Sequence, residues 1–179
     1  MILTGPKIRE ERAAGRITIE PFDPGSVNPD SYNITLGATI GYYTEAVLDT
    51  RRPNTYETVE IGPEGFLLEP DRIYLGHSVE VIGSDHYVPT MHGRSGFARL
   101  GGYVHVTADL IDQGSVGQLT HMLRVVQPLV VYPGDSIAQV DFRVVLGEPM
   151  LYRGKYQGSR GPMPSRIHLD APRALAAAS

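Results

Sequence analysis

Hydrophobic and polar residues alternate over short stretches through most of this chain, and clusters of glycine, proline and aspartate separate the stretches. The alternation is clear in residues 72–81, and similar strand-like segments follow at 103–106, 117–126 and 137–145. Short strands with turn residues between them are typical of a β-sandwich or barrel. The pattern therefore predicts an all-β domain.

One helix is expected near the start of the chain. Thr4 can cap it, Pro6 suits its first turn, and Gly15 is placed to end it. Ile8 offers an apolar side chain to the core, but the segment is otherwise polar. The predicted helix is therefore short and only partly amphipathic.

The regular alternation stops near residue 151. Residues 152–166 are polar, basic and rich in glycine, which is typical of a mobile, solvated C-terminal tail. Residues 174–178 are mostly alanine and could extend a last helical turn. We therefore expect one β domain over residues 1–151, followed by a tail over residues 152–179.

The composition narrows the classes of function. The chain has 179 residues, enough for one domain with a sizeable core, and it has no cysteine. The absence of cysteine excludes disulfides, thiolate zinc sites, a cysteine nucleophile and the zinc-dependent nucleobase deaminases. The formal net charge of −4 argues against binding to nucleic acid or to an anionic membrane.

The sequence also lacks the segments that direct a chain to membranes. No apolar stretch near the first residue is long enough for a signal peptide, and no run of about 18 apolar residues occurs. We therefore expect no membrane partner and a cytoplasmic location.

The densest group of chemically useful residues is the segment HGRSGFARLG at residues 92–101. Glycines let backbone N–H groups approach a phosphate, Ser95 can donate a hydrogen bond, and Arg94 and Arg99 can bind phosphate oxygens. The segment does not match a P-loop. It suits an anion, although the same composition also fits a surface turn with solvated arginines.

Two further places carry candidate chemistry. Asp109 and Asp112 stand at a strand-to-turn junction, where Asp112 could act as a general base, although an aspartate before glycine more often bonds its own backbone. Lys155 and Tyr156 could close over a charged ligand or lie in a solvated tail. The six histidines show no metal-binding spacing, so no protein-held metal is expected.

Taken together and in order, several separated segments resemble the dCTP deaminase/dUTPase superfamily over about residues 1–170. These segments are AGRITIEPFDP, NPDSYNITLG, GRSGFARLGGYVHVTADLIDQG, YPGDSIAQV and GKYQGSRGPMPSR. Their order and spacing are most similar to the dCTP deaminases, including the bifunctional ones that also release pyrophosphate. The resemblance implies a distorted jelly-roll of the dUTPase-like β-clip type and a homotrimer with active sites between subunits.

The resemblance also implies a ligand and a set of site residues. The ligand is a pyrimidine nucleotide, with Mg²⁺ held by its phosphates rather than by a protein cage. The expected catalytic residues are Asp112, Ser95 and Arg99, of which Asp112 meets the sugar hydroxyl and orients the attacking water. The expected substrate-binding residues are Arg94, Gly96, Ala108, Ser115, Met122, Gln139, Lys155 and Tyr156. The tail would then act as a lid over the phosphates.

Three positions depart from the deaminase pattern. Met122 stands where the resemblance places a glutamate that activates water, and a thioether cannot take or give that proton. The adjacent His121 points to the opposite face of a strand, so it is a poor replacement. Gly96 follows Arg94-Ser95 as in dUTPases, and Ser115 stands where an aromatic residue usually excludes a ribose 2′-hydroxyl. We therefore expect ribose or a modified sugar to be tolerated.

These observations lead to one main expectation and two alternatives. The main expectation is a nucleotide hydrolase that cleaves a phosphoanhydride bond of a pyrimidine nucleotide. The first alternative is a deaminase of cytosine nucleotides that uses a non-standard base such as Asp109 or His121. The second is a catalytically silent nucleotide-binding protein, which would retain the phosphate ligands but lack turnover.

Overall fold

The computed structural model describes residues 1–170 and consists mainly of antiparallel strands. This confirms the predicted all-β fold. The helices are α1 (Gly5–Ala13) and α2 (Ser95–Arg99), with short 3-10 turns η1 (Pro24–Ser26) and η2 (Ile167–Asp170). The strands are β1 (Thr18–Glu20), β2 (Tyr32–Ile34), β3 (Thr39–Tyr43), β4 (Tyr56–Glu60), β5 (Phe66–Leu68), β6 (Tyr74–Gly83), β7 (Tyr87–Gly93), β8 (Gly102–Tyr103), β9 (Val116–Val125), β10 (Leu129–Val131) and β11 (Ala138–Val144).

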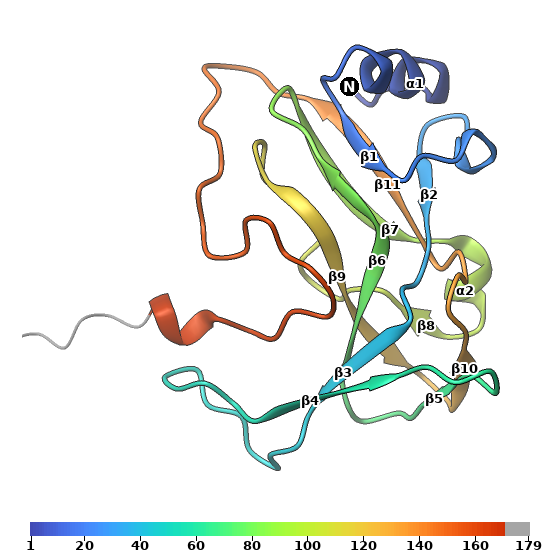
Figure 1. Cartoon of the computed structure of the whole chain (residues 1–179), viewed down its shortest axis with the longest axis vertical. Helices are drawn as coiled ribbons and strands as arrows, with labels where there is room; N and C mark the ends of the chain where they lie inside the picture. Colours follow the sequence, from blue (N-terminus) through green and yellow to red (C-terminus); the bar gives the residue numbers. More distant parts are fainter. Residues whose placement is uncertain (171–179) are drawn as a thin grey trace, which may run out of the picture.

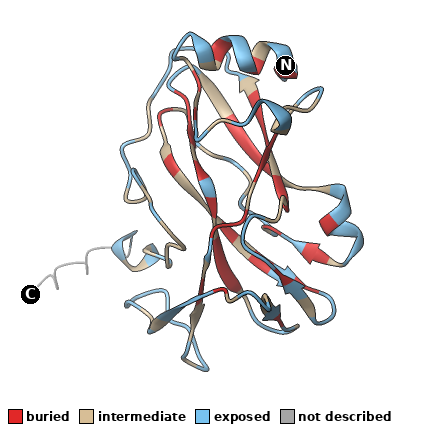
Figure 2. Cartoon of the chain, turned by 45° about the vertical axis from the view of Figure 1, so that its right-hand side comes forward, coloured by how far each residue is buried: buried red, intermediate tan, exposed pale blue. Residues whose placement is uncertain are grey.

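The strands form three sheets around one core (Figure 1). The largest sheet has the order β4-β3-β6-β9-β8, with β1 added to β6, and the other two are β2-β11-β7 and β10-β5. Buried residues recur along β6, β9 and β11, and Figure 2 shows buried strand segments running through the middle of the molecule. None of the described helices is long and apolar enough to cross a membrane.

The predicted helix is present as α1, and an ion-pair network fixes it to the domain. Ile8 is fully buried, and the other large buried side chain of the helix is Glu11. The Arg16 guanidinium bonds both carboxylate oxygens of Glu11, and Lys7 Nζ lies 3.0 Å from it. These cations hold the pKa of Glu11 well below its usual range. The helix is therefore anchored by a compensated buried charge as well as by apolar contact.

Residues 152–170 are packed against the domain, whereas their composition predicts a solvated tail. Gly158 N donates to Val116 O at 3.0 Å, Gln118 N donates to Ser159 O at 2.9 Å, and these bonds use an edge of β9. Backbone hydrogen bonds leave no hydrophobic pattern in the sequence, so composition alone misses this docking. The helical turn expected at residues 174–178 lies outside the described residues.

His121 on β9 is an unusual core residue. Its side chain is fully buried, and neither ring nitrogen has a hydrogen-bond partner within residues 1–170. Burial, with a smaller effect from His77, lowers the pKa of His121 from 6.5 to about 3. The imidazole is therefore neutral at physiological pH, and its polar atoms are a cost to the fold.

We expect His121→Leu to stabilise the protein and to reduce its sensitivity to acid. Because the folded-state pKa of His121 lies below its unfolded-state value, the unfolded chain binds the proton more tightly. The free energy of unfolding should fall as pH drops from about 6.5 toward 3, by about 1.4 kcal/mol per pH unit from this group. Urea unfolding at pH 7.5 and 5.5 measures this, with the exposed His86→Leu as control. Equal acid sensitivity of wild type and His121→Leu would contradict it.

Candidate functional site

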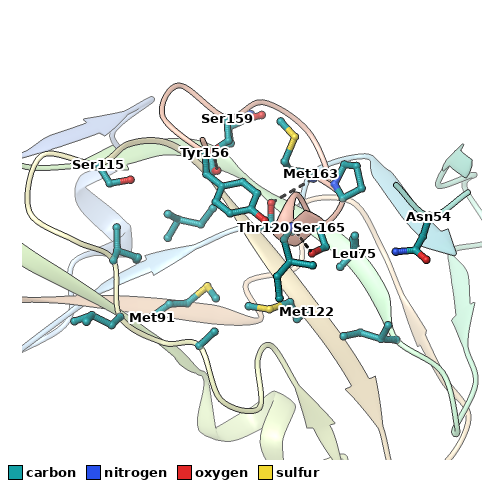
Figure 3. Close-up of a pocket in the computed structure, with 18 of the residues that line it drawn as sticks. Asn54, Leu75, Met91, Ser115, Thr120, Met122, Tyr156, Ser159, Met163 and Ser165 are labelled. Carbon is teal, nitrogen blue, oxygen red and sulfur yellow. Dashed lines mark hydrogen bonds between the residues drawn. The ribbon is translucent and has the colours of Figure 1, made fainter. Parts of the chain in front are cut away.

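A cavity of about 680 Å³ lies between β9, the tail segment (residues 152–170) and two loops. Apolar atoms make up most of its surface, and the close-up in Figure 3 shows Leu75, Met91, Met122 and Met163 among the apolar side chains that line it. They come from four parts of the chain: residues 43–54, residues 73–91, residues 108–122 and residues 152–167. A concave, mostly apolar pocket with a few polar groups is the usual form of a small-molecule site.

Five of the residues predicted from sequence line this cavity. They are Ala108, Asp112, Ser115, Met122 and Tyr156. The other predicted residues, Arg94, Ser95, Gly96, Arg99, Gln139 and Lys155, do not line it. One copy of the chain therefore brings together part of the expected site. The arginine–serine segment (residues 92–101) is absent from that part.

The turn from Asp112 to Ser115 presents two free polar groups to the cavity. Ser115 N donates to Asp112 O at 3.0 Å, and Gly114 between them has φ +89°, which favours glycine. The Asp112 carboxylate and the Ser115 hydroxyl make no hydrogen bond with the described residues. An aspartate at this position of a turn commonly hydrogen-bonds its own backbone, but the Asp112 carboxylate does not. Both Asp112 and Ser115 can therefore bind a ligand.

Met122 lies on the floor of the cavity, and the side chains beside it are apolar. It pairs with Leu75 across the β6–β9 ladder, and its thioether points toward that of Met91 (Figure 3). The described lining contains no histidine, lysine, arginine or glutamate, and its carboxylates are Asp49 and Asp112. Asp109 and His121, the alternative bases considered from sequence, do not line the cavity.

The arginine–serine segment forms the end of β7 and the short helix α2. Arg94 N donates to Ile137 O at 2.9 Å, and its guanidinium donates to Ser136 O at 3.2 Å. Ser95, Gly96 and Arg99 are exposed on α2. Figures 1 and 2 show α2 and the tail segment on opposite sides of the molecule. None of these four residues lines the cavity of its own copy.

The tail segment closes the cavity with the predicted Tyr156 and with residues that sequence reasoning did not identify, such as Met163 and Ser165. Tyr43 Oη accepts a hydrogen bond from Ser165 N at 2.7 Å, and Thr120 Oγ1 accepts one from Met163 N at 3.3 Å. Tyr156 lines the cavity and its hydroxyl accepts from Arg166 N at 2.8 Å. No local pattern predicts the contacts of Ser165 and Met163, because these contacts join parts of the chain more than 40 residues apart.

Lys155 is held away from the cavity by its neighbours. Its ammonium pairs with Asp170 and lies 5.6 Å from the centre of the Tyr156 ring. Its expected role at the phosphates therefore requires that this ion pair opens. Lys155 and Tyr156 are adjacent in sequence, but only Tyr156 faces the cavity in this arrangement.

The cavity suits a metal ion carried by a ligand better than a metal held by the protein. No group of three or more histidine, aspartate or glutamate side chains within residues 1–170 could hold a metal ion. The free Asp112 carboxylate offers one oxygen donor group at the cavity. Mg²⁺ is commonly bound by one or two carboxylates together with phosphates and water, so this donor set fits it.

Comparison with known proteins identifies the family that this chain matches. A family model described as dCTP deaminase-like matches residues 2–145. Proteins named "dCTP deaminase, dUMP-forming" from Leptospira biflexa and Clostridium beijerinckii are 42% and 40% identical over 171 residues, covering 95% of this chain and 98% of each relative. A crystal structure of 2′-deoxycytidine 5′-triphosphate deaminase from Agrobacterium tumefaciens has a TM-score of 0.62 and 22% identity. It covers 80% of this chain and 48% of its own, and it supports the jelly-roll fold.

We expect Gln118→Ala to loosen the tail segment. Gln118 Oε1 accepts from Gly161 N at 2.7 Å, and its Nε2 donates to Val79 O at 3.1 Å, so the side chain joins the tail to β6. Because proteases cut locally opened states, trypsin should cleave after Arg160 several-fold faster in the variant. Gln127→Ala, in an exposed turn, is the control. Equal cleavage of both variants would contradict the docking.

Proposed function

This chain belongs to the dCTP deaminase-like family, and we propose that it binds a pyrimidine nucleotide in the cavity and hydrolyses a phosphoanhydride bond of that nucleotide. The relatives are enzymes by name, which supports an enzymatic role. The single observation that carries the choice of reaction is Met122 on the floor of the cavity, where the side chains beside it, Leu75 and Met91, carry no proton-transfer group.

The names of the relatives describe two hydrolytic steps. Conversion of dCTP to dUMP breaks the bond between C4 of the base and its amine, and it also breaks the bond between the α and β phosphates. Weighed on these names alone, the deaminase alternative fits better than the phosphohydrolase that we expect from sequence. The chemistry of this particular cavity is what favours the phosphoanhydride step.

Deamination needs a group that takes a proton from water and gives one to the leaving amine. Met122 provides no such group, and Leu75 and Met91 beside it provide none. Phosphoanhydride hydrolysis makes a smaller demand, since positioning and charge neutralisation supply most of its catalysis. Asp112, with its free carboxylate, and the arginine–serine segment meet that demand.

We place the sugar beside Asp112 and Ser115 and the phosphates beside Arg94 and Ser95 of a neighbouring copy. The last two residues do not line the cavity of their own copy, so a homotrimer with shared sites accounts for both halves of the predicted residue set. Residues 1–151 form the binding domain in this proposal, and the tail segment acts as a lid.

In the proposed reaction, Asp112 orients a water molecule for attack on phosphorus. Arg94 and Ser95 donate hydrogen bonds to the phosphate oxygens on which charge develops. Mg²⁺ bound to the phosphates would neutralise part of the same charge. Tyr156 and the apolar tail residues exclude bulk water from the cavity.

A deaminase is the second candidate, because relatives about 40% identical over almost the whole chain carry that name. It requires a base other than residue 122. Asp112 and Asp49 are the carboxylates that line the described cavity. Release of ammonia separates this candidate from the first.

The direct test is mass spectrometry of products after incubation with Mg²⁺ and a panel of nucleotides. The panel contains dCTP, dUTP and the corresponding ribonucleotides, because the small Ser115 leaves room beside the sugar. Loss of phosphate or pyrophosphate with the base unchanged is the expected result. A mass gain of about one unit on the base would support the deaminase instead, and retention of ligand without product would indicate a binding protein.

We expect Met122→Glu to create or raise deamination of cytosine nucleotides. The glutamate would place an acid–base group on the cavity floor, and such groups contribute about 10²–10⁴-fold in rate. Met122→Gln is the matched control, because its side chain has a similar size and cannot transfer a proton. Release of ammonia from dCTP by the three proteins measures the effect. Equal rates in the glutamate and glutamine variants would contradict the assignment of this position to the base.

A further inference from the structure

The cavity extends past the places that the proposed function gives to the sugar and the base. Figure 3 shows Ser115 at one end of the cavity and Asn54 at the other, with Met122 between them. The sugar lies at the Ser115 end in the proposed function, and Met122 lies beside the base. A pyrimidine nucleoside placed in this way leaves the Asn54 end of the cavity unfilled.

The volume of the cavity supports the same conclusion. A pyrimidine deoxynucleoside has about 16 non-hydrogen atoms, and even at about 30 Å³ for each, the share of one water molecule in the liquid, it fills only about 480 Å³. The cavity holds about 680 Å³. The proposed function places the phosphates outside it, beside Arg94 and Ser95 of a neighbouring copy. Roughly 200 Å³ of the cavity is therefore available to a larger base.

The Asn54 end of the cavity is formed by the loop between β3 and β4, and hydrogen bonds within that loop hold its shape. Asp49 N donates to Asn54 Oδ1 at 2.7 Å, and Asn54 Nδ2 donates to Asp49 O at 2.9 Å. Glu45 accepts from Thr55 N at 2.6 Å and from Arg52 Nη1 at 2.9 Å. The loop closes these bonds with its own groups, so this end of the cavity is formed before a ligand binds.

Two polar groups of the loop remain free for a ligand. The Thr50 hydroxyl makes no hydrogen bond within residues 1–170, and the Asp49 carboxylate uses Oδ1 to accept from Arg51 N at 2.8 Å. The other oxygen, Oδ2, lies 3.8 Å from Arg52 Nε, beyond hydrogen-bond distance. Leu48 lines the cavity beside them. This combination of an apolar wall and a free acceptor suits a short carbon chain that ends in a hydrogen-bond donor.

We infer that this end of the cavity, lined by Leu48, Asp49, Thr50 and Asn54, is a subsite for a substituent on the pyrimidine base. The substituent is carried by the C4–C5 edge of the ring, which lies opposite the glycosidic bond and so points away from the sugar. The ligand class is a pyrimidine nucleotide whose base bears a chain of a few carbon atoms, with an amine or hydroxyl at its tip. The inference rests on the proposed function for the places of sugar and base, and it does not depend on hydrolysis.

The test is calorimetric titration of the intact protein at pH 7 with dUMP, 5-propynyl-dUMP and 5-aminopropargyl-dUMP. These monophosphates contain no phosphoanhydride bond, so binding is measured without turnover. Because each buried methylene-sized group strengthens binding about fourfold, the propynyl chain should raise the affinity about tenfold or more over dUMP. The terminal amine should add about two- to fivefold through the half-exposed Asp49 carboxylate. Asp49→Asn, which keeps an acceptor for Arg51 N, should lose that increment.

Thr50→Phe tests whether the chain occupies this subsite. Thr50 is exposed, so the new ring can fill the subsite without entering the core. The ratio of the affinity for 5-propynyl-dUMP to that for dUMP should fall to about one. Val47→Phe is the matched control, because Val47 is 78% exposed in the same loop and does not line the cavity. It should keep the wild-type ratio.

The outcomes separate this inference from the proposed function. Equal or lower affinity of the wild type for the substituted nucleotides, or a ratio that Thr50→Phe leaves unchanged, overturns the inference and leaves the proposed hydrolysis standing. Absence of binding by all three monophosphates overturns the inference together with the nucleotide site. A preference for the substituted nucleotides that Thr50→Phe removes, with no hydrolysis of any triphosphate, supports the inference and overturns the proposed function.

Discussion

The antiparallel pairing of β6 with β9 is the constraint on which the site depends. Its register sets Leu75 against Met122, and the alternation of the strand then sends Met122 to the cavity and His121 to the core. A slip of one residue would exchange these two side chains. The same register holds the turn at Asp112 and Ser115 beside the cavity. Met122 and these two polar residues therefore keep fixed positions relative to one another.

The free edge of β9 determines how the cavity is covered. Near its start the strand pairs with β6 on one side, and its other edge receives the backbone of residues 158 and 159. Further along, Gly161 N and Met163 N donate to the side chains of Gln118 and Thr120. An unpaired edge needs hydrogen-bond partners, and the tail segment supplies them without requiring apolar side chains of its own. Contacts from Tyr43 and Tyr56 then fix the part of the tail that lies over the cavity. Hydrogen bonds to the tail backbone, from the main chain of β9 and from neighbouring side chains, therefore enclose the site.

The sequence allowed the strand pattern, the first helix and one wall of the cavity to be predicted, because each depends on local periodicity or on a contiguous motif. Asp112, Ser115 and Met122 fall within one such motif and face one cavity. The docking of the tail could not be predicted, since each of its hydrogen bonds to the domain has at least one backbone partner and joins distant parts of the chain. The absence of Arg94 from the cavity lining could not be predicted either, because a motif gives the order of residues and not the side of a sheet on which they end.

We propose that a complete site needs the cavity of one copy and the arginine–serine segment of another. Mixing two inactive variants tests this most directly: Asp112→Asn disables the cavity, and Arg94→Ala disables the segment. When the two are unfolded and reassembled together, random assortment pairs an intact cavity with an intact segment in about one quarter of the sites. We predict recovery of nucleotide turnover to about that fraction of wild type. No recovery from the mixture, with both variants folded and assembled, would contradict the account.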